Sequence, residues 1–217
     1  MRAGIRAGLP IAPAALLVGI SFGVLAEPVM GTVAPIVMSA VVFAGSAQFA
    51  ALAVLAAGGG PGAAIVAGVL LNARYVPMGV ALAPSLRGGT LRRAVVGQAM
   101  VDASWAMSSR GGGHFDPVFM VGATVPSYPA WVAGTAIGVL AGDLIGDPER
   151  LGLDALFPAF FLALLVTELG RGPRAIAAAA IGSALALALA PVTAPGIPVI
   201  AACAAALIAL RPGRRPA

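Results

Sequence analysis

The sequence predicts an all-α polytopic membrane protein with six to eight membrane segments. Of its 217 residues, 60% are hydrophobic and only 10% are charged, whereas soluble domains carry about 25% charged residues. Uncharged apolar stretches recur along the chain, and about 20 apolar residues suffice to cross a bilayer as one helix. Because the connections between these stretches are short, we expect residues 1–217 to form a single transmembrane domain.

Eight apolar segments account for most of the chain. The first is expected to end at Glu27, because the residue before Pro28 is disfavoured in a helix. Residues 109–127, which include three consecutive glycines, are expected to form a polar connection. The eight segments are residues 9–26, 34–57, 62–83, 94–108, 128–145, 155–167, 175–190 and 197–210.

Basic residues gather at segment ends. The clusters are Arg2 and Arg6; Arg87, Arg92 and Arg93; Arg171 and Arg174; and Arg211, Arg214 and Arg215. This distribution is typical of cytoplasmic flanks that meet anionic lipid. The net charge of +5 therefore indicates a lipid bilayer as partner and no nucleic acid, because a nucleic-acid surface needs basic side chains on one polar face.

A polar interruption lies near the middle of the uncharged segment 34–57. Gly45, Ser46 and Gln48 stand where hydrocarbon offers no hydrogen-bond partner, and an unpaired amide in an apolar medium costs roughly 4–8 kcal/mol. Gln48 is therefore expected to face protein, water or a ligand. Close helix packing is the alternative explanation; it accounts well for the two small residues and poorly for Gln48.

The two halves of the chain resemble each other. Residues 23–26 and 138–141 both read Gly-Val-Leu-Ala, and the Gly-Pro pair at 60–61 recurs at 172–173. Such matches also arise by chance in a chain rich in alanine and glycine, so chance is the alternative. The matches predict two repeats, residues 9–85 and residues 128–190.

Such repeats would pair two interrupted segments, 34–57 and the short, proline-containing 155–167. If both cross the membrane, the basic cluster at 87–93 lies opposite the other three. If both re-enter on one side, all four clusters are cytoplasmic, and the first segments of the two repeats cross in opposite directions. The positive-inside rule favours this second arrangement of inverted repeats with two broken or re-entrant helices. Paired broken segments indicate a transporter binding site.

Two charged residues lie at mid-depth in the predicted segments. An arginine at the bilayer centre costs about 2.5–3.5 kcal/mol by insertion scales. Arg74 is therefore expected to pair or to line a cavity, and Asp102 is its partner by sign and depth. Gln98 precedes Asp102 by one helical turn, which places both on one helix face. A packing interpretation stands beside this one: the ion pair only fixes the helices, and Asn72 bonds them together.

We expect neither an enzyme nor a bound metal or cofactor. The chain has one histidine, His114, and one cysteine, Cys203, which do not supply a histidine-based metal site. It lacks a Walker A sequence, so nucleotide hydrolysis by that route is excluded. An ion or proton gradient is then the expected energy source for any transport.

Five stretches, in order along nearly the whole chain, resemble one known family. They are Gly19-Ile20-Ser21-Phe22-Gly23, Phe43-Ala44-Gly45-Ser46-Ala47-Gln48-Phe49, Leu71-Asn72-Ala73-Arg74-Tyr75, the segment with Asp102, and Leu153-Asp154-Ala155-Leu156-Phe157-Pro158-Ala159-Phe160-Phe161. That family is AzlC. The resemblance implies a branched-chain amino acid transporter of the bacterial inner membrane, generally an exporter, with a small AzlD-type partner subunit. Tyr75 and Ala103 depart from the family pattern, which has histidine and an acidic residue there in many members, so a proton relay is not carried over.

The sequence therefore predicts a secondary transporter that exports branched-chain amino acids by alternating access. The substrate carboxylate would meet a half-helix N-terminus or Arg74, and the ammonium would meet Asp102 or carbonyls freed at Gly45-Ser46. The alternative is a membrane scaffold or sensor that transports nothing. A transporter predicts a polar cavity that joins the amides to the charged pair, whereas a scaffold predicts tight pairing without a cavity. The expected substrate-binding residues are Gly45, Ser46, Gln48, Asn72, Arg74, Gln98 and Asp102.

Overall fold

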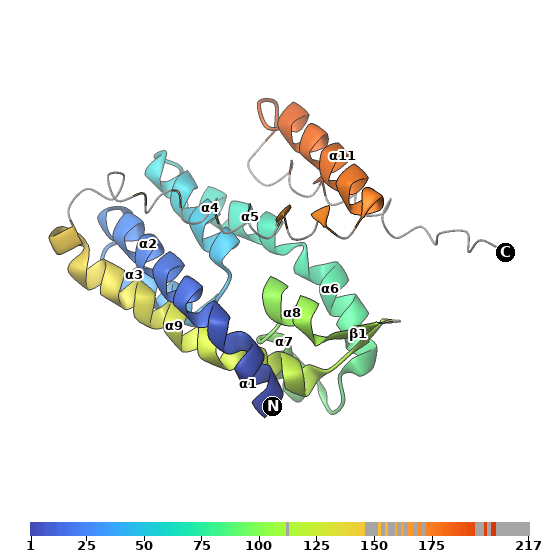
Figure 1. The fold of residues 1–217 in the computed structure, drawn as a ribbon. Coiled ribbons are helices and arrows are strands. Elements are labelled where there is room, and N and C mark those ends of the chain that lie inside the picture. The colour runs from blue at the N-terminus through green and yellow to red at the C-terminus, as the bar shows by residue number, and fades with distance from the viewer. Residues whose placement is uncertain are drawn as a thin grey trace.

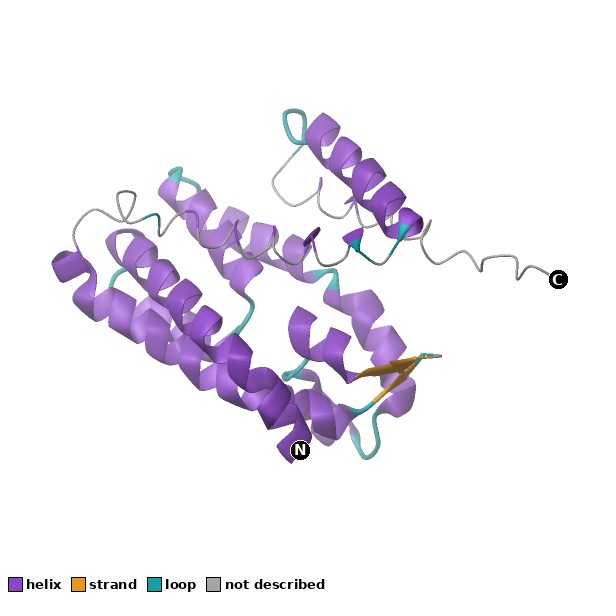
Figure 2. Ribbon diagram, in the orientation of Figure 1, coloured by secondary structure: helices purple, strands orange, loops and turns teal. Residues whose placement is uncertain are grey.

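The computed structural model describes residues 1–111, 113–145 and 172–193, together with scattered single positions between 152 and 202. Within these residues the protein is helical apart from one short hairpin, whose strands β1 (Ser109–Gly111) and β2 (His114–Phe115) pair antiparallel (Figure 2). The predicted all-α class is therefore confirmed for the part of the chain that the structure describes.

The chain begins with a rod of 29 residues, Arg2–Met30. Its parts are α1 (Arg2–Gly8), the 3-10 turn η1 (Leu9–Ile11) and α2 (Ala12–Met30). The predicted end at Glu27 is wrong, because α2 continues through Pro28 and stops at Gly31. Gly31 has a φ of 73°, which glycine adopts without a Cβ clash, and its N–H closes the helix on the Glu27 carbonyl at 2.8 Å.

α9 (Pro117–Ile145) is the second long helix, and it begins eleven residues before the predicted start at 128. Residues 109–127 are thus the hairpin and the first turns of α9, not the polar connection that was predicted. Asp116 caps this helix, since its carboxylate accepts the Phe119 N–H at 2.9 Å and the Arg110 guanidinium at 2.9 Å. Proline at the first helical position is also favourable, because its missing N–H has no partner there anyway.

The first rod and α9 lie side by side and run in the same direction (Figure 1). Gly4 meets Gly122 near one end of this contact, and Gly23 meets Gly138 near the other. At all four positions an added Cβ would overlap the backbone of the facing helix. Small residues that let backbones approach this closely are a common means of helix association in membranes.

The parallel direction contradicts the inverted arrangement predicted for these two segments. First segments of inverted repeats would cross in opposite directions, whereas these two helices run together. The prediction counted crossings from positive flanks and assumed two interrupted segments, but more segments are interrupted than that. The sequence match between the two helices extends beyond Gly-Val-Leu-Ala. Pro-x-x-Pro-Ala recurs at 10–14 and 126–130, and Gly-x-x-x-Gly recurs at 19–23 and 134–138.

Three predicted segments between the long helices are each broken into two short helices. Segment 34–57 breaks as predicted, at residues 42–44. Segment 62–83 bends by 41° after residue 72, and segment 94–108 unwinds at residues 98–101; neither of these two breaks was predicted. The six helices are α3 (Val33–Val41), α4 (Gly45–Ala56), α5 (Pro61–Asn72), α6 (Tyr75–Leu82, continued by η2, Ala83–Ser85), α7 (Thr90–Gly97) and α8 (Asp102–Ser108).

Helices that could cross a membrane are few among the described residues. Among them one helix, the first rod, is long and apolar enough to cross a membrane alone, and the bent pair α5–α6 is a second if it counts as one span. α11 (Pro173–Leu189) agrees with the predicted segment 175–190. Segments 155–167 and 197–210 lie outside the continuously described residues, so the second broken segment and the second repeat stay predictions.

We predict that Gly138→Ala destabilises the contact between α2 and α9. The added methyl would overlap the Ile20 carbonyl oxygen, and overpacking of this kind costs about 1–3 kcal/mol. Gly142→Ala, one turn further along α9, is the matched control, because its Cβ would meet nothing within 4 Å. Alanine improves helix propensity there by up to about 1 kcal/mol. Thermal unfolding in detergent compares the two variants, and equal midpoints would contradict the close contact.

We predict that the start of α9 loses stability in acid. The pKa of the Asp116 carboxyl is held below its ordinary value of 3.8. The largest cause is the hydrogen bond from the Phe119 N–H, and the second is the hydrogen bond from the Arg110 guanidinium. The carboxyl therefore stabilises the folded state at pH values above its ordinary pKa. This stabilisation is lost as the pH falls through the lower pKa that the carboxyl has in the folded protein.

Two variants separate the cap from the charge. Asp116→Ala should lower stability by about 1 kcal/mol near neutral pH, the usual cost of losing a cap. Asp116→Asn keeps a capping side chain and should lose less. Unfolding midpoints measured from about pH 5 to about pH 3 should fall less for both variants than for the wild type, because neither variant has a carboxyl to protonate. The same fall in all three proteins would contradict the role of Asp116.

Candidate functional site

The break between α3 and α4 leaves carbonyls at the end of α3, and two polar side chains bind them. The Tyr128 hydroxyl donates to the Ala40 carbonyl at 2.7 Å, and Nε2 of Gln98 donates to the Val41 carbonyl at 3.1 Å. Phe43, within the break, has a φ of 44°, a left-handed conformation that costs non-glycine residues roughly 1–2 kcal/mol. Its buried ring packs edge-on against Tyr128, with centroids 4.9 Å apart, which offsets that strain.

Gly45 and Ser46 form the first turn of α4. The prediction that carbonyls are freed there is wrong, because the first turn of a helix leaves N–H groups without an intrahelical partner, and the last turn leaves carbonyls. No side chain of the described residues caps α4. Its N-terminus carries roughly half a positive charge from the helix dipole, so this part of the break favours an anion.

Gln48 lies in a buried hydrogen-bond network that ties α3, α4 and α9 together. Its Nε2 donates to Ser39 Oγ at 2.9 Å, and the indole N–H of Trp131 donates to the same oxygen at 3.2 Å. Ser39 also bonds Thr135 at 2.8 Å, and Oε1 of Gln48 accepts the Ala44 N–H at 3.3 Å. Gln48, Ser39 and Thr135 are 0% exposed. Of the three environments expected for Gln48, the structure shows protein.

Arg74 and Asp102 form the expected ion pair, with 2.9 Å between Nη2 and Oδ2. Arg74 stands at the bend between α5 and α6, and Asp102 is the first residue of α8, so each charge lies where a segment is broken. The Arg74 guanidinium also donates to the Tyr75 hydroxyl at 3.4 Å and lies 5.0 Å from the centroid of that ring. The Arg74 and Asp102 side chains are 19% and 39% exposed, so the pair is not sealed inside protein.

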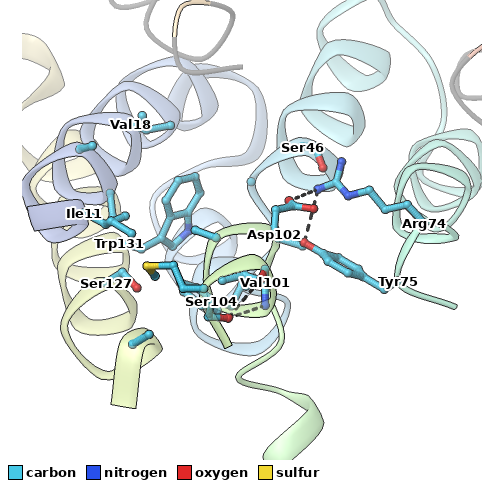
Figure 3. Close-up of a pocket in the computed structure, with 18 residues that line it drawn as sticks. Ile11, Val18, Ser46, Arg74, Tyr75, Val101, Asp102, Ser104, Ser127 and Trp131 are labelled. Carbon is cyan, nitrogen blue, oxygen red and sulfur yellow. Dashed lines mark hydrogen bonds and ion pairs between the residues drawn. The ribbon is translucent and has the colours of Figure 1, made fainter. Parts of the chain in front are cut away.

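These charges lie on one wall of a cavity of about 120 Å³ (Figure 3). Gly45 and Ser46 at the start of α4 line the cavity beside them, and Val18 of α2 and Trp131 of α9 lie on the opposite side. This volume suits a ligand much smaller than a drug-sized molecule, whose pockets measure roughly 300–1,000 Å³. The cavity thus combines a positive helix end, an ion pair and an apolar wall.

The cavity gathers four of the seven expected binding residues. These are Gly45, Ser46, Arg74 and Asp102. It also gathers Tyr75 and Trp131, which the sequence did not single out as binding residues. Tyr75 gave a signal, a polar aromatic side chain next to an intramembrane arginine. Trp131 gave none, because an apolar side chain is expected throughout such segments.

The other three expected binding residues lie elsewhere. Gln48 belongs to the buried network, and Asn72 lines a separate apolar groove among α3, α4 and α5. Gln98 is exposed after the end of α7 and bonds the Val41 carbonyl. The expectation that it shares a helix face with Asp102 is wrong, because the chain unwinds between them. The predicted joining of both amides to the charged pair in one cavity is therefore not found.

One stretch has the spacing of a hydrolase nucleophile elbow, Gly-x-Ser-x-Gly, at residues 19–23. It lies in the middle of α2, Ser21 is 0% exposed, and both glycines pack on α9. A nucleophile elbow needs an exposed serine on a sharp turn between strand and helix, so this serine is structural. In the part of the chain that the structure describes, no three His, Cys, Asp or Glu side chains gather as metal ligands.

Helices that break around a small, partly polar cavity in an apolar helical protein are typical of membrane transport proteins. The protein belongs to the AzlC family, whose model matches residues 10–145. This range contains most of the first rod, all of α9, all three breaks and every residue of the cavity named above.

Three relatives are similar to this chain over most of its length. The Bacillus subtilis branched-chain amino acid transport protein AzlC is 27% identical over 164 residues, which are 74% of this chain and 64% of that protein. This chain thus spans less than two thirds of the Bacillus protein. An Archaeoglobus fulgidus membrane protein is 33% identical over 94% of this chain and 91% of its own length. Inner membrane protein YgaZ of Escherichia coli is 28% identical over 84% and 79%. No solved structure matches the chain.

We predict that Gln48→Leu weakens folding. Leucine leaves the Ala44 N–H and one acceptor site of Ser39 unbonded, and an unsatisfied buried polar group costs about 1–3 kcal/mol. Gln98→Leu is the comparison variant, since its exposed amide makes one bond, to the Val41 carbonyl, whereas the buried Gln48 amide makes two. Thermal unfolding should show the larger loss for Gln48→Leu. A Gln48 variant as stable as wild type would contradict the network.

Proposed function

We propose that this protein is a secondary transporter that exports branched-chain amino acids across the bacterial inner membrane. The observation that carries the proposal is the cavity, where an ion pair and a helix N-terminus lie opposite apolar side chains. An amino acid such as leucine presents the complementary groups, which are a carboxylate, an ammonium and a hydrocarbon side chain. The name of the Bacillus relative, a branched-chain amino acid transport protein, supports the same substrate class.

The proposed mechanism is alternating access around the breaks. Each of the three breaks contributes to the cavity, through Phe43, Arg74 and Val101. Helices broken at the binding site let one group of helices rock against another. The bond between Arg74 and Asp102 links two of these breaks, so an ammonium group that competes for Asp102 would loosen the link. An ion or proton gradient would drive the cycle.

A small AzlD-type membrane subunit is the proposed partner, and a multi-pass complex in the inner membrane is the proposed assembly. The resemblance of the chain to the AzlC family supports both. A scaffold or sensor that transports nothing is the second candidate. The direct bond between Arg74 and Asp102 favours it, because the two charges already neutralise each other. The cavity beside them favours the transporter, because a scaffold has no need of one.

Counterflow in proteoliposomes tests the proposed function. Vesicles that contain the protein, with or without the small subunit, are loaded with unlabelled leucine and given radiolabelled amino acids outside. Labelled leucine, isoleucine and valine should accumulate, whereas glutamate and lysine should not, because the cavity offers their charged side chains an apolar wall. Absence of uptake for every branched-chain amino acid under both conditions would overturn the proposal.

We predict that Arg74→Gln and Asp102→Asn each lower counterflow by tenfold or more, a loss of about 1.4 kcal/mol for each factor of ten. Each change removes one member of the pair and leaves the other without its partner. The charge exchange, Arg74→Asp with Asp102→Arg, should restore assembly but not transport, because it reverses the charges that the substrate meets.

Arg93→Gln is the control for arginine substitution, because the Arg93 side chain is exposed and, among the described residues, bonds only the Ala83 carbonyl, at 3.4 Å. It should leave counterflow and assembly unchanged. Size-exclusion profiles report assembly for every variant. If both single variants of the pair transport leucine as wild type does, the pair has no part in transport.

A further inference from the structure

The start of α4 presents hydrogen-bond donors to the cavity. The helix has 12 residues, and no side chain caps it, so N–H groups of its first turn lack a partner within the helix. The N-terminal end of a helix also favours carboxylates and phosphates through its partial positive charge. Many helices start in this way without binding anything, but here a second feature marks the site.

That feature is the Ser46 side chain. Ser46 is 7% exposed, and its hydroxyl is buried without a hydrogen-bond partner among the described residues. The hydroxyl lies on the cavity wall, next to the ion pair (Figure 3). Ser39, Ser104 and Ser108, which are also buried, each have a bonded hydroxyl. An unsatisfied buried hydroxyl is destabilising, so its presence at the cavity points to a ligand that bonds it.

The ion pair determines where the ammonium and the carboxylate of an amino acid can each bind in the cavity. Arg74 donates hydrogen bonds to Asp102 and Tyr75, so part of its donor capacity is already occupied. The N–H groups in the first turn of α4 have no partner within the helix. Asp102 uses one oxygen for Arg74, and an ionised carboxylate has about four lone-pair sites for acceptance. A cation therefore has an acceptor at Asp102, and an anion has donors at α4.

We propose that the first turn of α4, with the Ser46 hydroxyl, binds the carboxylate of the amino acid. Asp102, held in position by Arg74, binds the ammonium group. The hydrocarbon side chain then lies toward Val18 and Trp131 on the opposite wall. This assignment rests on the proposed function and adds to it a requirement, since an aliphatic amine that lacks the carboxylate is a poor ligand.

Equilibrium binding to the purified protein tests the assignment. The probes are radiolabelled leucine, and isopentylamine, which is leucine without its carboxylate, as a competitor. The wild type should bind leucine at least tenfold more tightly than isopentylamine. Ser46→Ala should weaken leucine binding about tenfold, which corresponds to 1.4 kcal/mol, and leave isopentylamine binding unchanged. Its unfolding midpoint should be equal to or above that of wild type, because the change removes an unsatisfied hydroxyl.

Ser108→Ala is the matched control. Ser108 is 0% exposed, its hydroxyl donates to the Trp105 carbonyl of its own helix at 2.8 Å, and it does not line the cavity. The Ser108→Ala variant should bind leucine as tightly as the wild type does. Unchanged leucine binding in Ser46→Ala, or equal wild-type affinity for leucine and isopentylamine, would overturn the carboxylate site alone. A wild-type protein that binds no branched-chain amino acid would overturn the proposed function, and the site with it.

Discussion

A break in a membrane helix leaves backbone groups that lipid does not bond, so the protein itself must bond them. The break between α3 and α4 depends on this constraint. Tyr128 binds a carbonyl at the end of α3, and Trp131 and Thr135 bind Ser39, which in turn holds Gln48. All three partners lie within two turns of α9. The same helix surface therefore fixes the break and forms one wall of the cavity.

The breaks also explain why charge is tolerated near the cavity. Arg74 and Asp102 each stand at an interruption, where neighbouring backbone groups already need polar partners. Pairing the two charges at 2.9 Å removes most of the cost of placing either one alone in an apolar protein. The proposed binding site for a zwitterion thus lies where the helices are least regular, and the long helices α2 and α9 supply the apolar wall opposite the charges.

The sequence predicted the features that single residues determine. The cost of an unpaired amide placed Gln48 in a polar environment, and the cost of a lone arginine paired Arg74 with Asp102. It did not predict features that depend on several weak signals. The break at residues 98–101 carries no proline, and α9 starts in a stretch rich in polar residues. Helix direction is a further case, because Gly-x-x-x-Gly in each segment indicates close packing but not the direction in which the partner helix runs.

The glycine contacts between the first rod and α9 limit how the protein can change shape. A Cβ added at Gly23 would overlap the Thr135 carbonyl, and one added at Gly138 would overlap the Ile20 carbonyl. A slip of one residue would bring Phe22 or Val24 to the place that only glycine fits, so the two helices have a single permitted register. In the proposed transport cycle they would therefore act as a stator, a fixed frame that keeps its internal geometry. Among the described helices, the shorter ones, α3 to α8, would then make the motion that opens the cavity to one side of the membrane and then the other.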